Sequence, residues 1–231
     1  MFVSLSDLAD AQGTPAPPSN RRANKTVRTN GQPFDRRLWI QYGDAGTAAT
    51  IEEMGRQAVK GSRDPIVRLI TYGVIKGIPG RDHRKIAERL FYWLQDHGSG
   101  EQSGVKFIND PFRTEQVRAP WWTLLVEGAG DCNSAFSTTI AAMLLSVGVP
   151  AFFRTVAADP GRPGSFSHVY TVGVCRGEQV ALDASVSFSD PGSEPSEIIR
   201  TKDWKIQFFD EDDAKRGSIE RLGSWLWRLI S

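Results

Sequence analysis

The sequence predicts an α+β fold, because helical and strand-like periodicities occupy different parts of the chain. Apolar residues recur with helical spacing between residues 48 and 97 and again between residues 133 and 148. Three strand-like segments then follow one another between residues 149 and 185, separated by turn residues. Helices followed by consecutive strands predict a helical part packed on an antiparallel β-sheet.

The first helical part contains three candidate helices. Two short apolar faces come first, and a clearer helix begins after the capping residue Asp82 and runs to about His97, with Gly98 as its stop. After the flexible segment 98–104, the sequence VKFIND predicts a short strand before Pro111. The two apolar faces consist of Ile51, Met54, Ala58 and Val59, and of Ile66, Leu69, Ile70 and Val74.

A further helix is expected directly after the sequence GDC at residues 130–132. Its apolar residues repeat every three to four positions, and Gly148 ends it. Cys132 therefore lies at the start of this helix. The apolar positions are Ala135, Phe136, Ile140, Met143, Leu144 and Val147.

Three strands are expected after this helix, in the sequences VPAFFRTVA, HVYTVGV and QVALDAS. The sequence CRGE joins the last two and has Gly177 late in the loop, as in a tight turn. Such a short connection requires the two strands to be antiparallel.

The chain is expected to divide into three regions. Residues 1–33 are rich in Gly, Pro, Ser, Asn and Arg and predict an extended, basic N-terminal arm. Residues 34–190 form the core, and residues 191–231 form a C-terminal extension that ends in a Trp-rich amphipathic helix. This last helix packs either on the core of its own chain or in a groove of a partner.

The charge balance argues against nucleic acid and membranes as partners. The chain has 231 residues, and 28 Lys and Arg residues against 27 Asp and Glu residues give a net charge of +1. Six basic residues between positions 21 and 37 are the only support for nucleic-acid binding, and they rest on charge alone. The N-terminus lacks the features of a secretory signal, so a cytoplasmic protein is expected.

No cofactor and no metal site are expected. The cysteines and histidines show no ligand-pair spacing, and the acidic residues do not cluster along the sequence as calcium ligands do. The residues considered as ligands are Cys132, Cys175, His83, His97 and His168.

Cys132 has the position of an activated nucleophile. Free amides and the partial positive charge of a helix N-terminus favour the thiolate form of a cysteine, and the same amides can stabilise an oxyanion. His168 opens one expected strand and Asp183 closes the next, so a hairpin would bring them together on one face. Asp183 could then orient His168 toward the thiol. Alternatively, Cys132 is a core residue, His168 a satisfied polar residue and Asp183 the start of a turn.

The segments GDCNSAFSTTIAAMLLSVGVPAFFRTV, SHVYTVGV and VALDAS together resemble the transglutaminase-like superfamily, over roughly residues 85–190. The sequence INDPFRTEQVRAPWWTLLVEGAGDC also looks like the lead-in of small bacteriophage and prophage members. The resemblance implies a papain-like α+β core with Cys132 as nucleophile, His168 as general base and Asp183 as its orienting residue. This chain has His-Val-Tyr and Asp-Ala-Ser where members often have His-Ala-Trp and Asp-Pro-Thr.

Two functions follow from this resemblance. The first is a cysteine acyltransferase or hydrolase that acts on an amide of a peptide or protein through a thioester. The alternative is a structural or assembly protein of a bacteriophage head or tail, active or inactive, whose arm and C-terminal helix bind other virion proteins. A protein of this second kind would occupy the host cytoplasm and the virion. The oxyanion donor is either the Cys132 amide or the indole of Trp93, Trp121 or Trp122.

Overall fold

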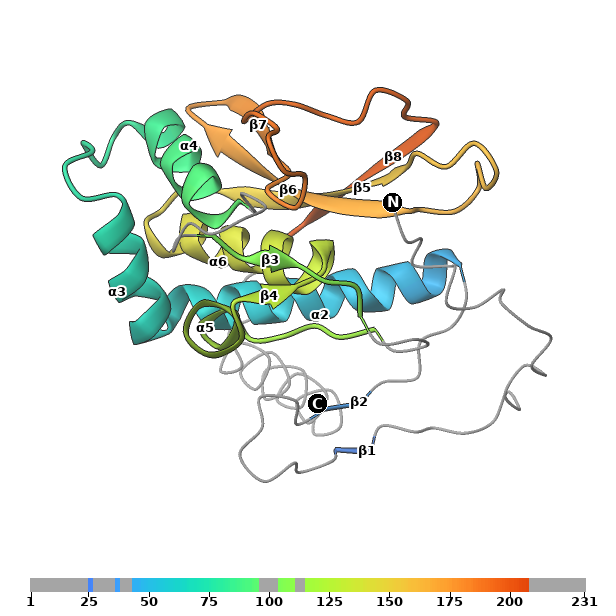
Figure 1. Cartoon of the computed structure of the whole chain (residues 1–231), viewed down its shortest axis with the longest axis horizontal. Coiled ribbons are helices and arrows are strands. Elements are labelled where there is room, and N and C mark those ends of the chain that lie inside the picture. The colour runs from blue at the N-terminus through green and yellow to red at the C-terminus, as the bar shows by residue number, and fades with distance from the viewer. Residues whose placement is uncertain (1–24, 27–35, 38–42, 96–103, 111–114, 208–231) are drawn as a thin grey trace, which may run out of the picture.

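A four-stranded antiparallel sheet forms one layer of the protein in the computed structural model (Figure 1). The structure describes residues 25–26, 36–37, 43–95, 104–110 and 115–207. The strand order is β7-β6-β5-β8. Helices cover one face of this sheet, so the α+β fold expected from the sequence is confirmed. The strands are β5 (Ala151–Ala157), β6 (His168–Cys175), β7 (Glu178–Leu182) and β8 (Arg200–Lys205).

The three strands expected from the sequence form as β5, β6 and β7, and the turn between β6 and β7 is two residues long. Arg176 and Gly177 both have positive φ angles, 54° and 92°, which give the twist that a two-residue hairpin needs. The fourth strand, β8, was not expected. It pairs with β5 at the edge of the sheet, so the sheet includes residues beyond 190.

Helix α6 (Thr138–Ser146) lies between the sheet and helix α2 (Asp44–Arg63), as Figure 1 shows. A helix that is apolar around its whole circumference can be stable only when it is buried on all sides. Residues 138–144 of α6 are all buried, and Ala141 contacts the apolar face of α2 through Met54 and Ala58. The cysteine helix expected from the sequence is thus the central element of the core.

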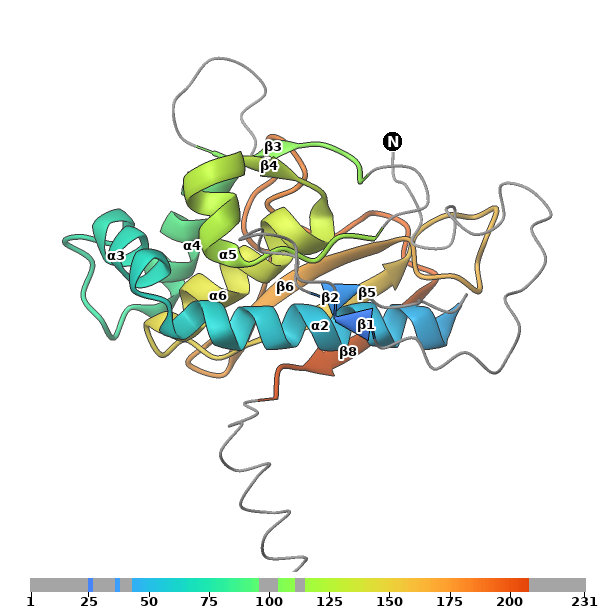
Figure 2. The same ribbon diagram turned by 90° about the horizontal axis from the view of Figure 1, so that it is seen from below.

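Helices α3 (Pro65–Val74) and α4 (His83–Leu94) lie together at one end of the molecule (Figures 1 and 2). Asp82 caps α4, since its Oδ1 accepts a hydrogen bond from the Lys85 amide at 3.2 Å. The helix ends at Leu94, before the residue expected, and residues 96–103 lie outside the described part. The prediction that Leu69 belongs to the buried face of α3 is wrong. Leu69 is 73% exposed, because Val67 and Thr71 face the core instead.

A second, smaller sheet joins two distant segments beside the cysteine helix. Strand β3 (Lys106–Phe107) is the short strand expected from VKFIND, and it pairs in parallel with β4 (Ala129–Gly130). Helix α5 (Pro120–Trp122) and the π-helix η1 (Thr123–Glu127) connect them. This pairing places the residues after β3 next to the GDC sequence.

The terminal regions are described only in part. The two-residue strands β1 (Lys25–Thr26) and β2 (Arg36–Arg37) pair with each other. The rest of the expected N-terminal arm and the expected Trp-rich C-terminal helix lie outside the described residues. Among the helices that the structure describes, none is long and apolar enough to span a membrane.

Candidate active site

Cys132 is the first residue of the six-residue π-helix η2 (Cys132–Ser137), which continues directly into α6. Asp131 caps this helix: its Oδ1 accepts hydrogen bonds from the Ser134 amide at 3.0 Å and the Ser134 hydroxyl at 2.8 Å. The position of Cys132 at a helix start is therefore confirmed. The π geometry was not expected, although such single turns often occur at functional sites.

His168 and Asp183 lie next to each other at the ends of β6 and β7. Extending the register in which Thr171 faces Leu182 places His168 opposite Ser185, with Asp183 two residues earlier on the same face. His168 Nε2 lies 2.6 Å from Asp183 Oδ2, and the two side chains are 3% and 7% exposed. The hairpin thus brings the two residues together as the sequence suggested.

His168 also contacts Cys132, so the structure brings all three expected residues into one group. The Cys132 and His168 side chains form a hydrogen bond, and Cys132 is half-buried. Because Nε2 of His168 faces Asp183, Nδ1 is the ring nitrogen left to face the thiol. The order thiol, imidazole, carboxylate is the arrangement that nucleophilic cysteine catalysis requires.

Two hydroxyl groups fix the cysteine helix to the strand of His168. The Ser137 hydroxyl lies 2.6 Å from the Cys132 carbonyl oxygen and 3.1 Å from that of Val169. The Thr171 hydroxyl donates a hydrogen bond of 2.8 Å to the Ser137 carbonyl. The Ser137 and Thr171 hydroxyl groups thus join the π-helix of Cys132 to the strand of His168. This connection holds the thiol and the imidazole at a defined separation.

The contact between Cys132 and His168 favours the ionised form of each group. Burial raises the pKa of the Cys132 thiol, and the charge and hydrogen bond of His168 offset part of this rise. Burial alone would lower the pKa of His168, but the charges of Asp183 and Cys132 raise it well above its usual value. Burial also opposes ionisation of Asp183, yet His168 keeps the pKa of its carboxyl below the usual value. His168 therefore holds the proton when Cys132 ionises.

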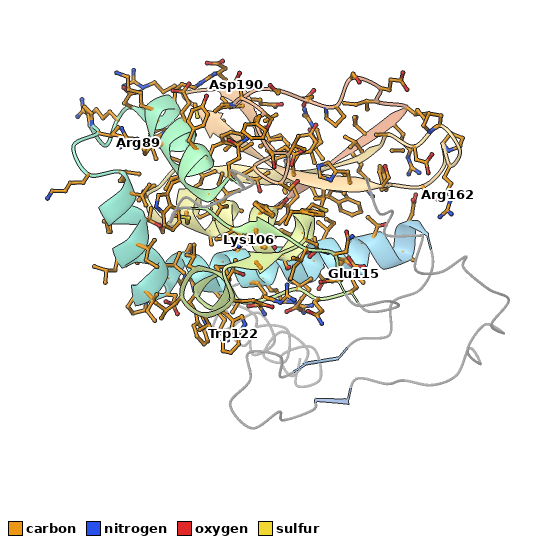
Figure 3. All side chains as sticks on the ribbon, viewed as in Figure 1. Arg89, Lys106, Glu115, Trp122, Arg162 and Asp190 are labelled. Carbon is orange, nitrogen blue, oxygen red and sulfur yellow. The ribbon has the colours of Figure 1, made fainter. Side chains whose placement is uncertain are left out.

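The loop after Asp183 contains supporting residues that sequence reasoning missed. The Ser185 hydroxyl donates a hydrogen bond of 2.6 Å to Asp183 Oδ1, so both carboxylate oxygens have partners. Gln95 Nε2 donates to the carbonyls of Val186 and Ser189, at 2.9 and 2.8 Å. At the end of the loop, Asp190 accepts a hydrogen bond from the Tyr92 hydroxyl (Figure 3). The only feature of the local sequence that could have indicated these residues is Ser185, a hydroxyl residue two positions after Asp183.

Three carboxyl groups that are spread along the sequence gather in space beside Cys132. One oxygen from each of Asp110, Glu115 and Asp131 lies within 4.8 Å of the other two. Burial and the charge of Asp131 raise the pKa of Asp110 to about 7 and that of Glu115 to about 9. Burial likewise raises the pKa of Asp131. No sequence pattern indicated this group, because the β3–β4 pairing brings Asp110 and Asp131 together from distant segments.

One of the three indole groups considered as oxyanion donors is bound to a carboxylate. The Trp122 indole donates a hydrogen bond of 3.1 Å to Glu127 Oε2. Trp93 and Trp121 pack on a core cluster around α4, whereas Cys132 packs on the cluster around Met54. The first amides of a helix have no partner within the helix, so the Cys132 amide stays the predicted donor.

Gly130, in the GDC sequence, leaves no room for a side chain. A Cβ atom there would lie 2.6 Å from Ala135 Cβ and 2.7 Å from Arg118 Nη1. Gly130→Ala is therefore expected to lower the free energy of unfolding by about 1–3 kcal/mol, as overpacking does, and to displace the start of η2. Urea denaturation measures the first effect and the alkylation rate of Cys132 measures the second.

Gly80→Ala is the matched control, because no atom lies within 4 Å of a Cβ atom at that position. Its effect is expected to stay within about 0.5 kcal/mol. Equal stabilities for the two variants would show that the tight contact at Gly130 does not exist in solution.

No family model matches this chain, and no curated protein matches it. Two solved structures are similar to part of this chain. A candidate protease from Parabacteroides distasonis has a TM-score of 0.44 and 14% identity, and the match covers 59% of this chain and 26% of that one. A candidate cysteine protease from Cytophaga hutchinsonii has a TM-score of 0.34 and 18% identity, with coverages of 59% and 41%. This chain therefore spans well under half the length of either protein, and neither description refers to a bacteriophage.

Proposed function

We propose that the protein is a cysteine-dependent enzyme that cleaves an amide bond through a thioester on Cys132. The observation that carries this proposal is the position of His168, which contacts the Cys132 thiol through one side of its ring and Asp183 through the other. A buried cysteine of the core would need neither partner. The three residues have the order and the contacts of a catalytic triad.

The chemistry follows from the contacts of the ring. His168 takes the thiol proton at Nδ1, and the thiolate attacks the carbonyl carbon of the amide. The C–N bond breaks, and the amine leaves with a proton from His168, so that Cys132 carries the acyl group as a thioester. Water or a second amine, deprotonated by His168, then attacks the thioester and restores the thiol. Asp183 holds the ring and stabilises its positive charge throughout.

An activated ester tests the nucleophile before any natural substrate is known. With p-nitrophenyl acetate, the wild-type protein is expected to release a burst of one p-nitrophenolate per chain and to carry an acetyl group on Cys132, located by mass spectrometry. Cys132→Ala is expected to lose the burst. Cys175→Ala is the matched control and is expected to keep it, since Cys175 is buried on β6 at the far end from His168.

The choice between water and an amine as acceptor can be read from the same reaction. If added glycine amide speeds the loss of the acetyl group and acetylglycine amide forms, the protein is an acyltransferase; otherwise it is a hydrolase. A wild-type protein without a burst would contradict both. The assembly role considered from the sequence depends on terminal regions outside the described residues, and no described contact favours it.

A further inference from the structure

We propose that Asp110, Glu115 and Asp131 bind a divalent cation beside the start of the cysteine helix. Asp110 follows β3, Asp131 caps η2, and Glu115 lies in the segment that leads to α5 (Figure 3). One oxygen of each lies within 4.8 Å of the other two. Such a separation allows one cation to contact all three groups without any rearrangement of the backbone.

Buried oxygens without partners point to a missing ligand at this group. Oδ1 of Asp110 is buried and accepts no hydrogen bond from any described residue, and the Asp110 side chain is 6% exposed. Asn133 is fully buried; its Nδ2 donates to Glu115 Oε1 at 2.5 Å, while Oδ1 of the same planar amide has no partner in the part of the chain that the structure describes. Since buried oxygens normally have a partner, these two atoms, one on Asp110 and one on the side chain bound to Glu115, support a ligand at the cluster.

The charge of the cluster also favours a bound cation. Arg118 is the basic residue in contact with it, and its Nη2 reaches Asp110 Oδ1 only at 3.9 Å. The Nε atom of Arg118 instead lies 2.9 Å from Glu127 Oε2, which adds a fourth carboxylate to the surroundings. Among the described residues, one guanidinium lies among four carboxylates, which leaves an excess of negative charge in a buried place. Such an excess needs protons or a metal ion.

The ligand set favours a hard cation of the size of Ca²⁺. All candidate ligands are oxygens, whereas zinc sites use nitrogen and sulfur. Bonds of about 2.3–2.6 Å let Ca²⁺ join oxygens up to about 5 Å apart, which spans this cluster, whereas Mg²⁺ with bonds of about 2.0–2.1 Å spans less. Asn133, whose Nδ2 is bound to Glu115, also carries an amide oxygen of the kind that Ca²⁺ accepts as a ligand.

Calcium binding to the full chain can be measured without any reference to catalysis. Isothermal titration calorimetry with CaCl₂ is expected to show one site with a dissociation constant of about 10⁻⁴–10⁻³ M, the range of the weakest class of protein calcium sites. Terbium, a calcium substitute, is expected to give luminescence on excitation of Trp122, whose indole contacts Glu127. Added CaCl₂ should then displace the terbium signal.

Glu115→Gln and Asp110→Asn each keep the shape of the side chain and are expected to weaken calcium binding at least tenfold. Glu178→Gln is the matched control, because Glu178 is an exposed carboxylate paired with Arg84 on another face, and its binding should equal that of the wild type. Cys132→Ala should also bind normally, so failure of the proposed activity and failure of this site give different results.

Circular dichroism of each variant shows whether it is folded before titration. Absence of saturable binding of Ca²⁺, Mg²⁺ and Mn²⁺ up to about 10 mM, ten times the weakest constant expected, would overturn the proposal and leave protons as the ions that neutralise the cluster. Calcium binding that persists unchanged in folded Glu115→Gln and Asp110→Asn would overturn it as well, because the ion would then lie elsewhere.

Discussion

His168→Ala is expected to reduce the rate of Cys132 acylation about 10²–10⁴-fold, the range of a general acid–base group. The variant removes the group that takes the thiol proton. It also removes the charge and the hydrogen bond that lower the pKa of Cys132, while the burial that raises this pKa stays. The alkylation of Cys132 by iodoacetamide should therefore shift to higher pH in the variant. Mass spectrometry after timed labelling between pH 5 and 10 measures this shift.

His83→Ala is the matched control, because His83 begins α4 and takes no part in the contacts around Cys132. It is expected to keep the wild-type labelling profile. Cys175 provides a reference within each sample, since burial raises the pKa of its thiol and it is only 4% exposed. Identical profiles of Cys132 in the wild type and His168→Ala would show that the thiol and the imidazole do not interact in solution, and would remove the basis of the proposed function.

The parts of the fold that the sequence predicted are those with local periodicity. The cysteine helix repeats its apolar residues every three to four positions, and β5 to β7 carry apolar runs bounded by turns. The two-residue turn at Arg176 and Gly177 then fixed which residues of β6 and β7 meet. This is why the proximity of His168 and Asp183 could be predicted from their distance to the turn alone.

The fourth strand could not be predicted in this way, because its side chains do not alternate between core and solvent. Strand β8 lies at the sheet edge, and most of its residues are exposed. Its one large apolar residue, Trp204, packs beside Phe153 and donates a hydrogen bond of 2.9 Å to the Thr155 hydroxyl. Pairing with β5 thus stabilises a strand whose own sequence resembles that of a loop.

The carboxyl cluster and the π-helix depend on contacts between residues far apart in the sequence. Asp110 and Asp131 meet because β3 and β4, each two residues long, pair in parallel, and such short strands give no periodic signal. Where η2 continues into α6, the Thr138 hydroxyl donates a hydrogen bond of 2.7 Å to the Asn133 carbonyl, five residues earlier. Sequence patterns predicted where the helix of Cys132 begins. They carried no information on its π-helical geometry or on the carboxyl cluster beside it.

Asp183→Asn is expected to lower amide turnover about 10³–10⁴-fold, the effect typical of the loss of an orienting carboxylate in a triad. The negative charge of Asp183 raises the pKa of His168, so that pKa should fall in the variant. The imidazolium that stabilises the Cys132 thiolate then persists to a less alkaline pH. The alkaline limb of the pH–rate profile of acylation should therefore move to lower pH, whereas Asp203→Asn, a change at an exposed carboxylate on β8 that pairs with Arg154, should leave it in place.

The same pair predicts how stability depends on pH. Asp183 has a lowered pKa, so its contribution is complete above the pKa of an unfolded aspartate and is lost as the pH falls. His168 has a raised pKa, so its contribution is complete below the pKa of an unfolded histidine and is lost as the pH rises through its folded value. The full contribution is thus present only between roughly pH 4 and 6.5.

Asp183→Asn should consequently reduce the free energy of unfolding most within that window, by about 3–5 kcal/mol, because it leaves one partner of a buried pair without the other. Urea denaturation at several pH values between 4 and 9 measures the difference from the wild type. Ser185→Ala keeps the charge of Asp183 and removes only one of its hydrogen bonds, so about 1 kcal/mol is expected there. A difference for Asp183→Asn that does not change with pH would mean that the carboxylate and the imidazole do not form an ion pair, and His168 would then need another source for its orientation.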